Sequence, residues 1–110
     1  MINVGIVRDG SGFIWQFTVE GHAGYADPGQ DIICAAASVT AYTAVGALED
    51  LAGIKNTYTE NEGFIFCSIP EDITEEQKQI ARIILETTVI GFKQIELTHK
   101  EFLTVLEEEV

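Results

Sequence analysis

Alternating apolar positions predict a β-hairpin in the first twenty residues. Residues 9–12, with sequence Asp-Gly-Ser-Gly, separate two alternating runs and have the composition of a turn. The apolar positions of the two expected strands are Ile2, Val4, Ile6, Phe13, Trp15, Phe17 and Val19. Side chains two positions apart lie on the same face of a strand, so we expect both sets to face one core.

A long helix of small residues is expected next. Residues 21–30 hold three glycines and a proline without periodicity, which is typical of a loop. Asp31 is a candidate N-cap, the helix continues to about Ala52, and Gly53 is a natural stop. Small or apolar residues surround nearly the whole helix before Glu49. It therefore needs cover on more than one side, from a second helix or a second subunit.

A second hairpin is expected over residues 56–60 and 63–69, around an Asn-Glu-Gly turn. Phe64 and Phe66 fall on one side of the second strand, and Ile65 and Ile69 fall on the other. Both sides of this strand then require burial, and dimerisation is one way to provide it.

A second helix should begin after Thr74, because Thr74 and Gln77 have the spacing of a capping box. Its polar face carries charged residues such as Lys78 and Glu86. We expect one buried stripe, made of Ile80, Ile83, Ile84, Thr87, Ile90, Gly91 and Ile95.

A last strand is expected over residues 101–105, followed by a solvated end at Glu107, Glu108 and Glu109. The element order is thus β-β-α-β-β-α-β in a single domain, residues 1–110. This order predicts an α+β fold, a two-layer α/β sandwich with two helices on one face of a mostly antiparallel sheet.

Charge and composition restrict the partners. The 110 residues carry a net charge of −12, which opposes binding to phosphates and favours a basic protein partner, so no direct nucleic acid is expected. The N-terminus lacks the features of a secretory signal, which predicts a cytoplasmic protein. The uncharged run 32–48 is shorter than the ~20 residues of a membrane helix and contains polar residues, so we expect no membrane partner.

The histidines and cysteines do not form a metal-binding pattern. Cys34 and Cys67 are too few for a disulfide framework, and both thiols should be reduced. Together with His22 and His99 they lack the short spacings of zinc ligands. We therefore expect no metal and no other cofactor.

His22 and Cys34 suit cysteine-based acyl chemistry. Cys34 follows the expected helix start closely, where the helix dipole favours a thiolate and unpaired backbone N–H groups can bind an oxyanion. His22 can exchange the proton. The alternatives are a Cys34 that only packs and a His22 on the solvated surface, with Cys67 structural.

Two further residues have two interpretations each. Asp31 either caps the helix, which we favour, or orients the imidazole of His22. Ser38 lies one helical turn after Cys34, where its hydroxyl can face the thiolate or bond to the carbonyl of Cys34.

This constellation resembles one protein family. The motif is Gly21-His22-Ala23, Gly29, Asp-Ile-Ile-Cys-Ala-Ala at 31–36, and Ser38, and it looks like that of the ribosomal-processing cysteine proteases, Prp. The resemblance implies a homodimeric α/β sandwich. It also implies a protease that removes the N-terminal extension of large-subunit ribosomal protein twenty-seven, cutting after a phenylalanine.

The resemblance assigns the catalytic dyad to His22 and Cys34. It also implies a mobile loop that orders around substrate, here containing Gly21, Gly24 and Gly29. An apolar substrate pocket is expected, for which Tyr25, Ile33 and Tyr42 are candidates by their position in the sequence. Two other functions remain open, a non-catalytic acidic binding module that assists ribosome assembly and a cysteine amidase of small molecules.

Overall fold

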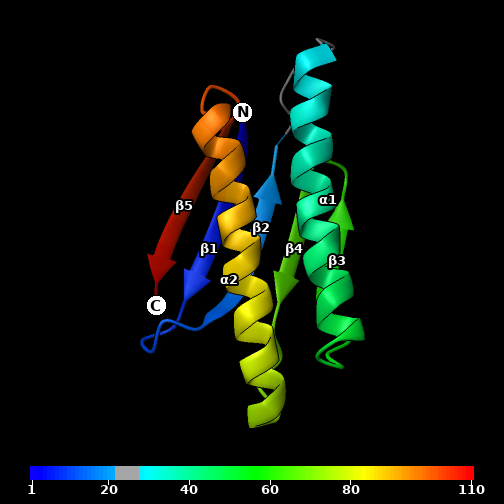
Figure 1. Ribbon diagram of the computed structural model, residues 1–110, viewed down its shortest axis with the longest axis vertical. Coiled ribbons are helices and arrows are strands. Elements are labelled where there is room, and N and C mark those ends of the chain that lie inside the picture. Colours follow the sequence, from blue (N-terminus) through cyan, green and yellow to red (C-terminus); the bar gives the residue numbers. More distant parts are fainter. Residues whose placement is uncertain (22–27) are drawn as a thin grey trace.

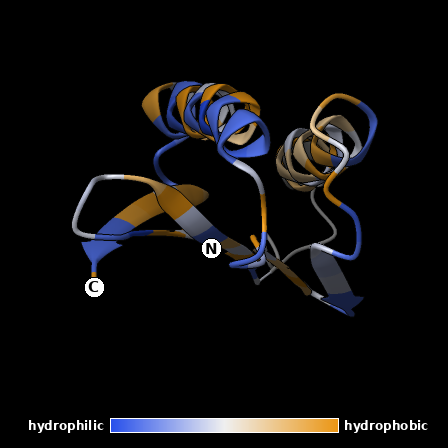
Figure 2. Ribbon diagram, turned by 90° about the horizontal axis from the view of Figure 1, so that it is seen from below, coloured by the Kyte–Doolittle hydropathy of each residue, from blue (hydrophilic) through white to orange (hydrophobic). Residues whose placement is uncertain are grey.

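The computed structural model describes residues 1–21 and 28–110, with side chains in the second range from Ile32 onward. It contains the predicted β-β-α-β-β-α-β order: β1 (Ile2–Arg8), β2 (Ile14–Glu20), α1 (Pro28–Asp50), β3 (Tyr58–Asn61), β4 (Phe64–Ser68), α2 (Glu75–Thr98) and β5 (Leu103–Glu109). The sheet order is β3-β4-β2-β1-β5, and only the β1–β5 pair is parallel. Both helices cover one face of this sheet (Figures 1 and 2), which confirms the predicted two-layer sandwich.

An irregularity in the first hairpin changes which residues reach the core. Val7 pairs with Gln16 and Arg8 pairs with Ile14, so Trp15 is an extra residue on β2. A bulge of this kind shifts the alternation by one position. Ile14 is consequently buried and Trp15 is exposed, so the prediction that Trp15 faces the core is wrong.

Helix α1 begins earlier than the sequence predicted. It starts at Pro28, three residues before Asp31, so the assignment of Asp31 as N-cap is wrong. Proline suits the first position of a helix because its fixed φ matches the helix and its missing N–H would have no partner there. Gly29 consequently belongs to the helix rather than to the loop in which we expected it.

Helix α1 packs one stripe of mostly small residues into the core: Ile33, Ala37, Ala41, Ala44 and Leu48. Helix α2 lies beside it, and a Cβ added at Gly91 of α2 would lie 3.3 Å from the Thr40 methyl group of α1. The expected cover by a second helix is confirmed. Residues Ile32–Asp50 also have the length and apolar composition of a membrane span, as core helices of soluble proteins can, so the absence of a membrane partner stays a prediction.

Helix α2 has two apolar stripes rather than one. The capping box of Thr74 and Gln77 is present as predicted. The buried stripe consists of Ala81, Leu85, Thr88, Val89 and Phe92. The assignment of Ile83, Thr87 and Ile90 to the buried stripe is wrong, because all three are exposed. On the same helix, Ile83, Ile90 and Leu97 are the exposed large apolar residues. These three residues, seven positions apart, form a separate outer stripe, because a seven-residue step returns to nearly the same side of a helix.

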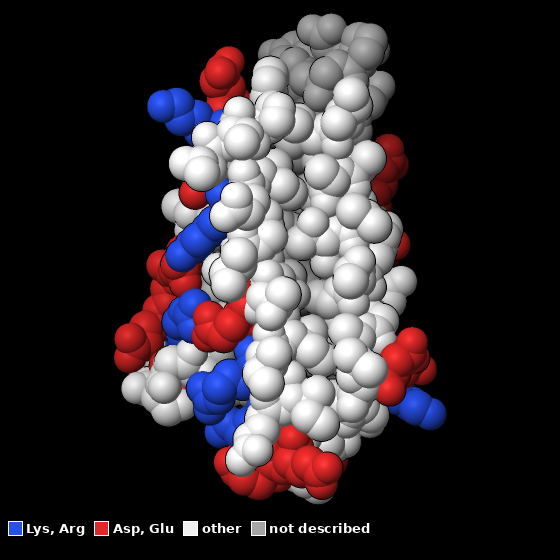
Figure 3. All heavy atoms as spheres, in the orientation of Figure 1, with Lys and Arg blue, Asp and Glu red and all other residues white. Residues whose placement is uncertain are grey.

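The surface formed by the outer sides of the two helices is largely uncharged (Figure 3). On the opposite side of the sheet, Phe64 and Phe66 are only half-buried and Leu106 is exposed, because both helices lie on the other face. Both surfaces thus offer apolar area for an additional contact.

The acidic C-terminal residues are part of the sheet. Strand β5 extends to Glu109, so the prediction that it ends near residue 105 before a solvated tail is wrong. The Glu107 carboxylate accepts hydrogen bonds from Lys93 Nζ at 2.7 Å and from Arg8 Nε at 3.0 Å. The Lys93 ammonium and then the Arg8 guanidinium lower the pKa of Glu107. These contacts connect β5 to β1 and α2.

Gly21 allows β2 to end against the N-terminus. Its φ is +99°, and a Cβ at this position would lie 2.5 Å from the Met1 carbonyl oxygen. Its N–H donates to the Gly63 carbonyl at 2.8 Å, which connects the end of β2 to the β3–β4 turn. Any other residue here would have both a strained backbone and a steric clash.

We expect Gly21→Ala to lower the free energy of unfolding by about 1–3 kcal/mol, because the backbone must move away from Met1 or adopt a strained φ. Urea denaturation measures this difference. Gly10→Ala is the matched control, since no atom lies within 4 Å of a Cβ at Gly10. Equal stability of the two variants would contradict the close approach at Gly21.

Candidate active site

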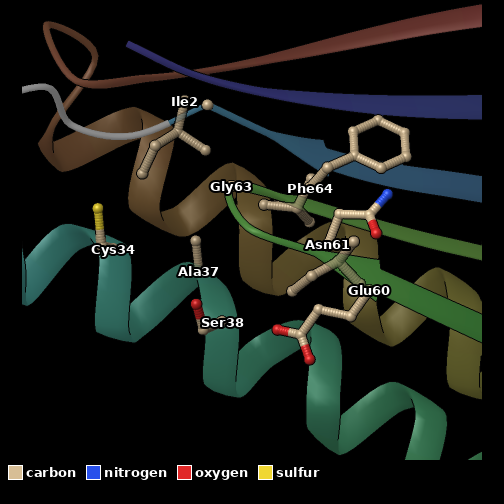
Figure 4. Close-up of a pocket in the computed structure, with 11 residues that line it drawn as sticks. Ile2, Cys34, Ala37, Ser38, Glu60, Asn61, Gly63 and Phe64 are labelled. Carbon is tan, nitrogen blue, oxygen red and sulfur yellow. The ribbon is translucent and has the colours of Figure 1, made fainter.

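A cavity of about 120 Å³ lies between the first half of α1, the end of β2 and the β3–β4 hairpin (Figure 4). Its walls include Cys34 and Ser38 from α1, Gly21 after β2, and Glu60 and Phe64 from the hairpin. The space exceeds the 10–15 Å³ that one water requires, so it can accept a side chain or several waters.

Cys34 lies at the edge of the buried stripe of α1 and is half-buried. Ser38 lines the same cavity one turn later, which confirms that the two residues share a face of the helix. Cys34 thus combines support from the core with access to the cavity, as a nucleophile requires.

The earlier helix start changes how Cys34 can be activated. Cys34 is six residues beyond Pro28, so it lies in the second turn and not in the first. The N–H groups without helical partners belong to the first four residues, and the effect of the dipole declines within the first turn. The expectations that the Cys34 amide binds an oxyanion and that Cys34 lies in the first turn, where the helix dipole is effective, are therefore wrong.

Cys67 provides a clear contrast within the same chain. It is 1% exposed on β4, and burial raises the pKa of its thiol to about 11, with the Thr57 hydroxyl as a smaller opposing influence. Neither Cys34 nor Cys67 is in a disulfide. The structural role predicted for Cys67 agrees with this burial.

The other predicted site residues are only partly described. His22, Gly24 and Tyr25 lie outside the described residues, as does the side chain of Asp31. Of the two remaining pocket candidates, Ile33 is buried in the core and does not line the cavity, whereas the Tyr42 hydroxyl donates a hydrogen bond to the Glu60 carboxylate.

The sequence analysis did not identify the β3–β4 side of the cavity. Glu60, Asn61, Gly63 and Phe64 lie about thirty residues after Cys34 and reach it only through the pairing of β4 with β2. The alternation of residues in the second hairpin could have indicated the position of Glu60. Glu60 pairs with Ile65, whose side chain is buried, so alternation in the hairpin puts a carboxylate on the helix-facing side of the edge strand.

Within residues 1–21 and the described part of 28–110, no three His, Cys, Asp or Glu side chains converge in a way that could hold a metal ion.

Comparison with known proteins identifies the family. The family model described as "Cysteine protease Prp" matches residues 1–104. The chain is 32% identical over 107 residues to the ribosomal processing cysteine protease Prp of Bacillus subtilis, with 96% of each chain covered.

Solved structures share the fold. A crystal structure from Streptococcus mutans matches with a TM-score of 0.83 at 27% identity, covering 100% of this chain and 96% of the other. The Prp protease of Staphylococcus aureus in complex with a substrate peptide matches with a TM-score of 0.84 at 23% identity, covering 98% and 100%. The chain thus belongs to the Prp family of ribosomal-processing cysteine proteases.

Proposed function

We propose that this protease removes the N-terminal extension of large-subunit ribosomal protein twenty-seven, cutting after a phenylalanine, with Cys34 as nucleophile and His22 as general base and acid. The observation that carries the proposal is the cavity that Cys34 and Gly21 line together. His22 follows Gly21 directly in the sequence.

The reaction proceeds through a thioester. His22 takes the thiol proton of Cys34, and the sulfur attacks the carbonyl carbon of the scissile peptide bond. The C–N bond breaks as the imidazolium of His22 donates its proton to the leaving amine. A water molecule then loses a proton to His22, attacks the thioester and releases the acid product and the Cys34 thiol.

The charge of the chain supports a ribosomal protein as substrate. A net charge of −12 attracts a basic protein at long range and repels the phosphates of ribosomal RNA. We assign the reaction to the cytoplasm, where unfolded or newly made ribosomal proteins and reduced thiols are available.

We further propose a homodimer that forms through the outer surface of the helix layer. The outer stripe of α2 exposes Ile83, Ile90 and Leu97, and α1 exposes Ile32 and Val39. The outer surface of the helix layer is largely uncharged (Figure 3). An apolar surface without charges is typical of the core of a dimer interface.

The dimer proposal predicts that Ile90→Asp weakens self-association about tenfold or more, because the interface would bury an unpaired carboxylate. Sedimentation velocity over a range of protein concentrations measures this change. Leu106→Asp is the matched control on the sheet face, since Leu106 is 61% exposed and Ile90 is 59% exposed. Dissociation by Leu106→Asp but not by Ile90→Asp would assign the interface to the sheet instead.

The dyad predicts selective alkylation of Cys34. We expect iodoacetamide to modify Cys34 near neutral pH and His22→Ala to slow this modification, because the imidazole no longer takes the thiol proton. Cys67 should stay unmodified until the pH approaches its pKa of about 11 or the chain unfolds. Mass spectrometry of tryptic peptides after alkylation at a series of pH values distinguishes the two thiols.

The cleavage reaction is tested with the extended ribosomal protein as substrate. We expect the wild-type protein and Cys67→Ala to remove the extension, and Cys34→Ala and His22→Ala to lose at least about 10³-fold in kcat/KM. Mass spectrometry of the products locates the cut relative to the phenylalanine. If Cys34→Ala cleaves as fast as wild type, Cys34 is not the nucleophile. If wild type binds the extended protein and does not cleave it, the chain acts as a non-catalytic acidic module.

A further inference from the structure

The cavity extends along α1 beyond the nucleophile. Cys34, Ser38 and Tyr42 are four residues apart and therefore follow one another on the same side of the helix. Cys34 and Ser38 line the cavity near its Gly21 end, and the Tyr42 hydroxyl bonds to Glu60, which lines the opposite side (Figure 4). Eight residues at about 1.5 Å each separate Cys34 from Tyr42 by roughly 12 Å along the helix.

Glu60 is an unusual residue for its place in the sheet. On the helix-facing side of the sheet it continues the row of Val4, Val19 and Ile65, all of which are buried and apolar. At the end of this row, on the edge strand β3, Glu60 is exposed and its side chain extends toward α1. An apolar residue at position 60 would continue this row without placing a charged carboxylate on the helix-facing side of the sheet.

No ion pair within the described part of the chain neutralises the charge of Glu60. The ion pairs among the described residues are Arg8–Glu86, Arg8–Glu107 and Lys93–Glu107, and none of them includes Glu60. Its partner is the neutral Tyr42 hydroxyl, and the negative charge of Glu60 raises the pKa of that phenol. No Lys or Arg is among the described residues that line the cavity.

We propose that Glu60, oriented by Tyr42, is a specificity-determining residue that binds a Lys or Arg side chain of the substrate three or four residues from the scissile bond. The spacing follows from geometry, because an extended peptide advances about 3.3 Å per residue and Glu60 bonds to Tyr42, whose backbone lies roughly 12 Å along α1 from Cys34. Tyr42 is a positioning residue, since its hydroxyl holds the carboxylate on the cavity side. This inference rests on the proposed protease function and extends it to the substrate sequence.

The test is a charge scan of the substrate. Peptides that span the cleavage site of the ribosomal-protein extension are made with either Lys or Gln at each position within five residues of the cut, and kcat/KM is measured for every pair. We expect wild type to prefer Lys by up to about fivefold at one or two positions three or four residues from the cut. This preference should decrease at high salt, because the pair is exposed to solvent.

Substitutions at the site connect the preference to Glu60. Glu60→Gln should abolish the preference for Lys over Gln at the substrate position that wild type selects. Glu60→Lys should reverse the charge preference, so that a peptide with Glu at this position is cleaved faster than the peptide with Lys. Tyr42→Phe should reduce it, because the carboxylate loses its orienting bond. Glu62→Gln is the matched control, since it removes the same charge from the adjacent turn without lining the cavity, and it should keep the preference.

The outcomes separate this inference from the proposed function. A wild-type protein that cleaves none of the peptides overturns the proposed function. Binding of the same peptides to Cys34→Ala, measured by fluorescence anisotropy, then tests Glu60 by itself. Equal affinity for Lys and Gln peptides, absence of binding, or an unchanged preference in Glu60→Gln overturns the role of Glu60.

Discussion

The close packing of α1 on the sheet is the constraint that determines the position of the active site. Because the inward residues Ala37, Ala41 and Ala44 are small, the helix can lie close to β2 and β4 and beside α2. The position of Cys34 next to this stripe follows from the same packing, since a residue adjacent to a buried helical position lies at the boundary between core and solvent. The nucleophile is thus held by core packing, while the cavity in front of it is completed by the hairpin.

The start of α1 at Pro28 places Cys34 in the second turn of the helix, beyond the N–H groups that lack helical partners. If the helix began at Asp31, the dipole and the amide of Cys34 could both support a thiolate and an oxyanion. With three more residues before Cys34, that amide belongs to the helical ladder. In the proposed dyad, His22 rather than the start of α1 would activate the Cys34 thiol.

The sequence predicted the elements better than their boundaries and exposed faces. The alternation of apolar residues and the capping box correctly predicted the order of strands and helices. The reason is that an element with one buried face repeats its apolar residues at the period of a strand or of a helix. Trp15 was assigned to the wrong face because a bulge shifts the period, and Ile83 and Ile90 were misassigned because apolar residues on an outer stripe have the same helical spacing as core residues. At the site, Cys34 and Ser38 were local in sequence, whereas Glu60 reaches them only through long-range strand pairing.

Long-range charge and local charge have different roles in such a protease. A net charge of −12 increases the rate of encounter with any basic protein, but a field of this range cannot select one peptide bond among many. Selection of one peptide bond requires a contact at a fixed distance from the Cys34 sulfur. The Glu60 carboxylate on the edge strand β3, opposite α1, provides such a contact. Because β3 is an edge strand that pairs with β4 and contacts α1 through the Tyr42–Glu60 hydrogen bond, a movement of the hairpin would change this distance, so the stability of these contacts would affect substrate choice as well as folding.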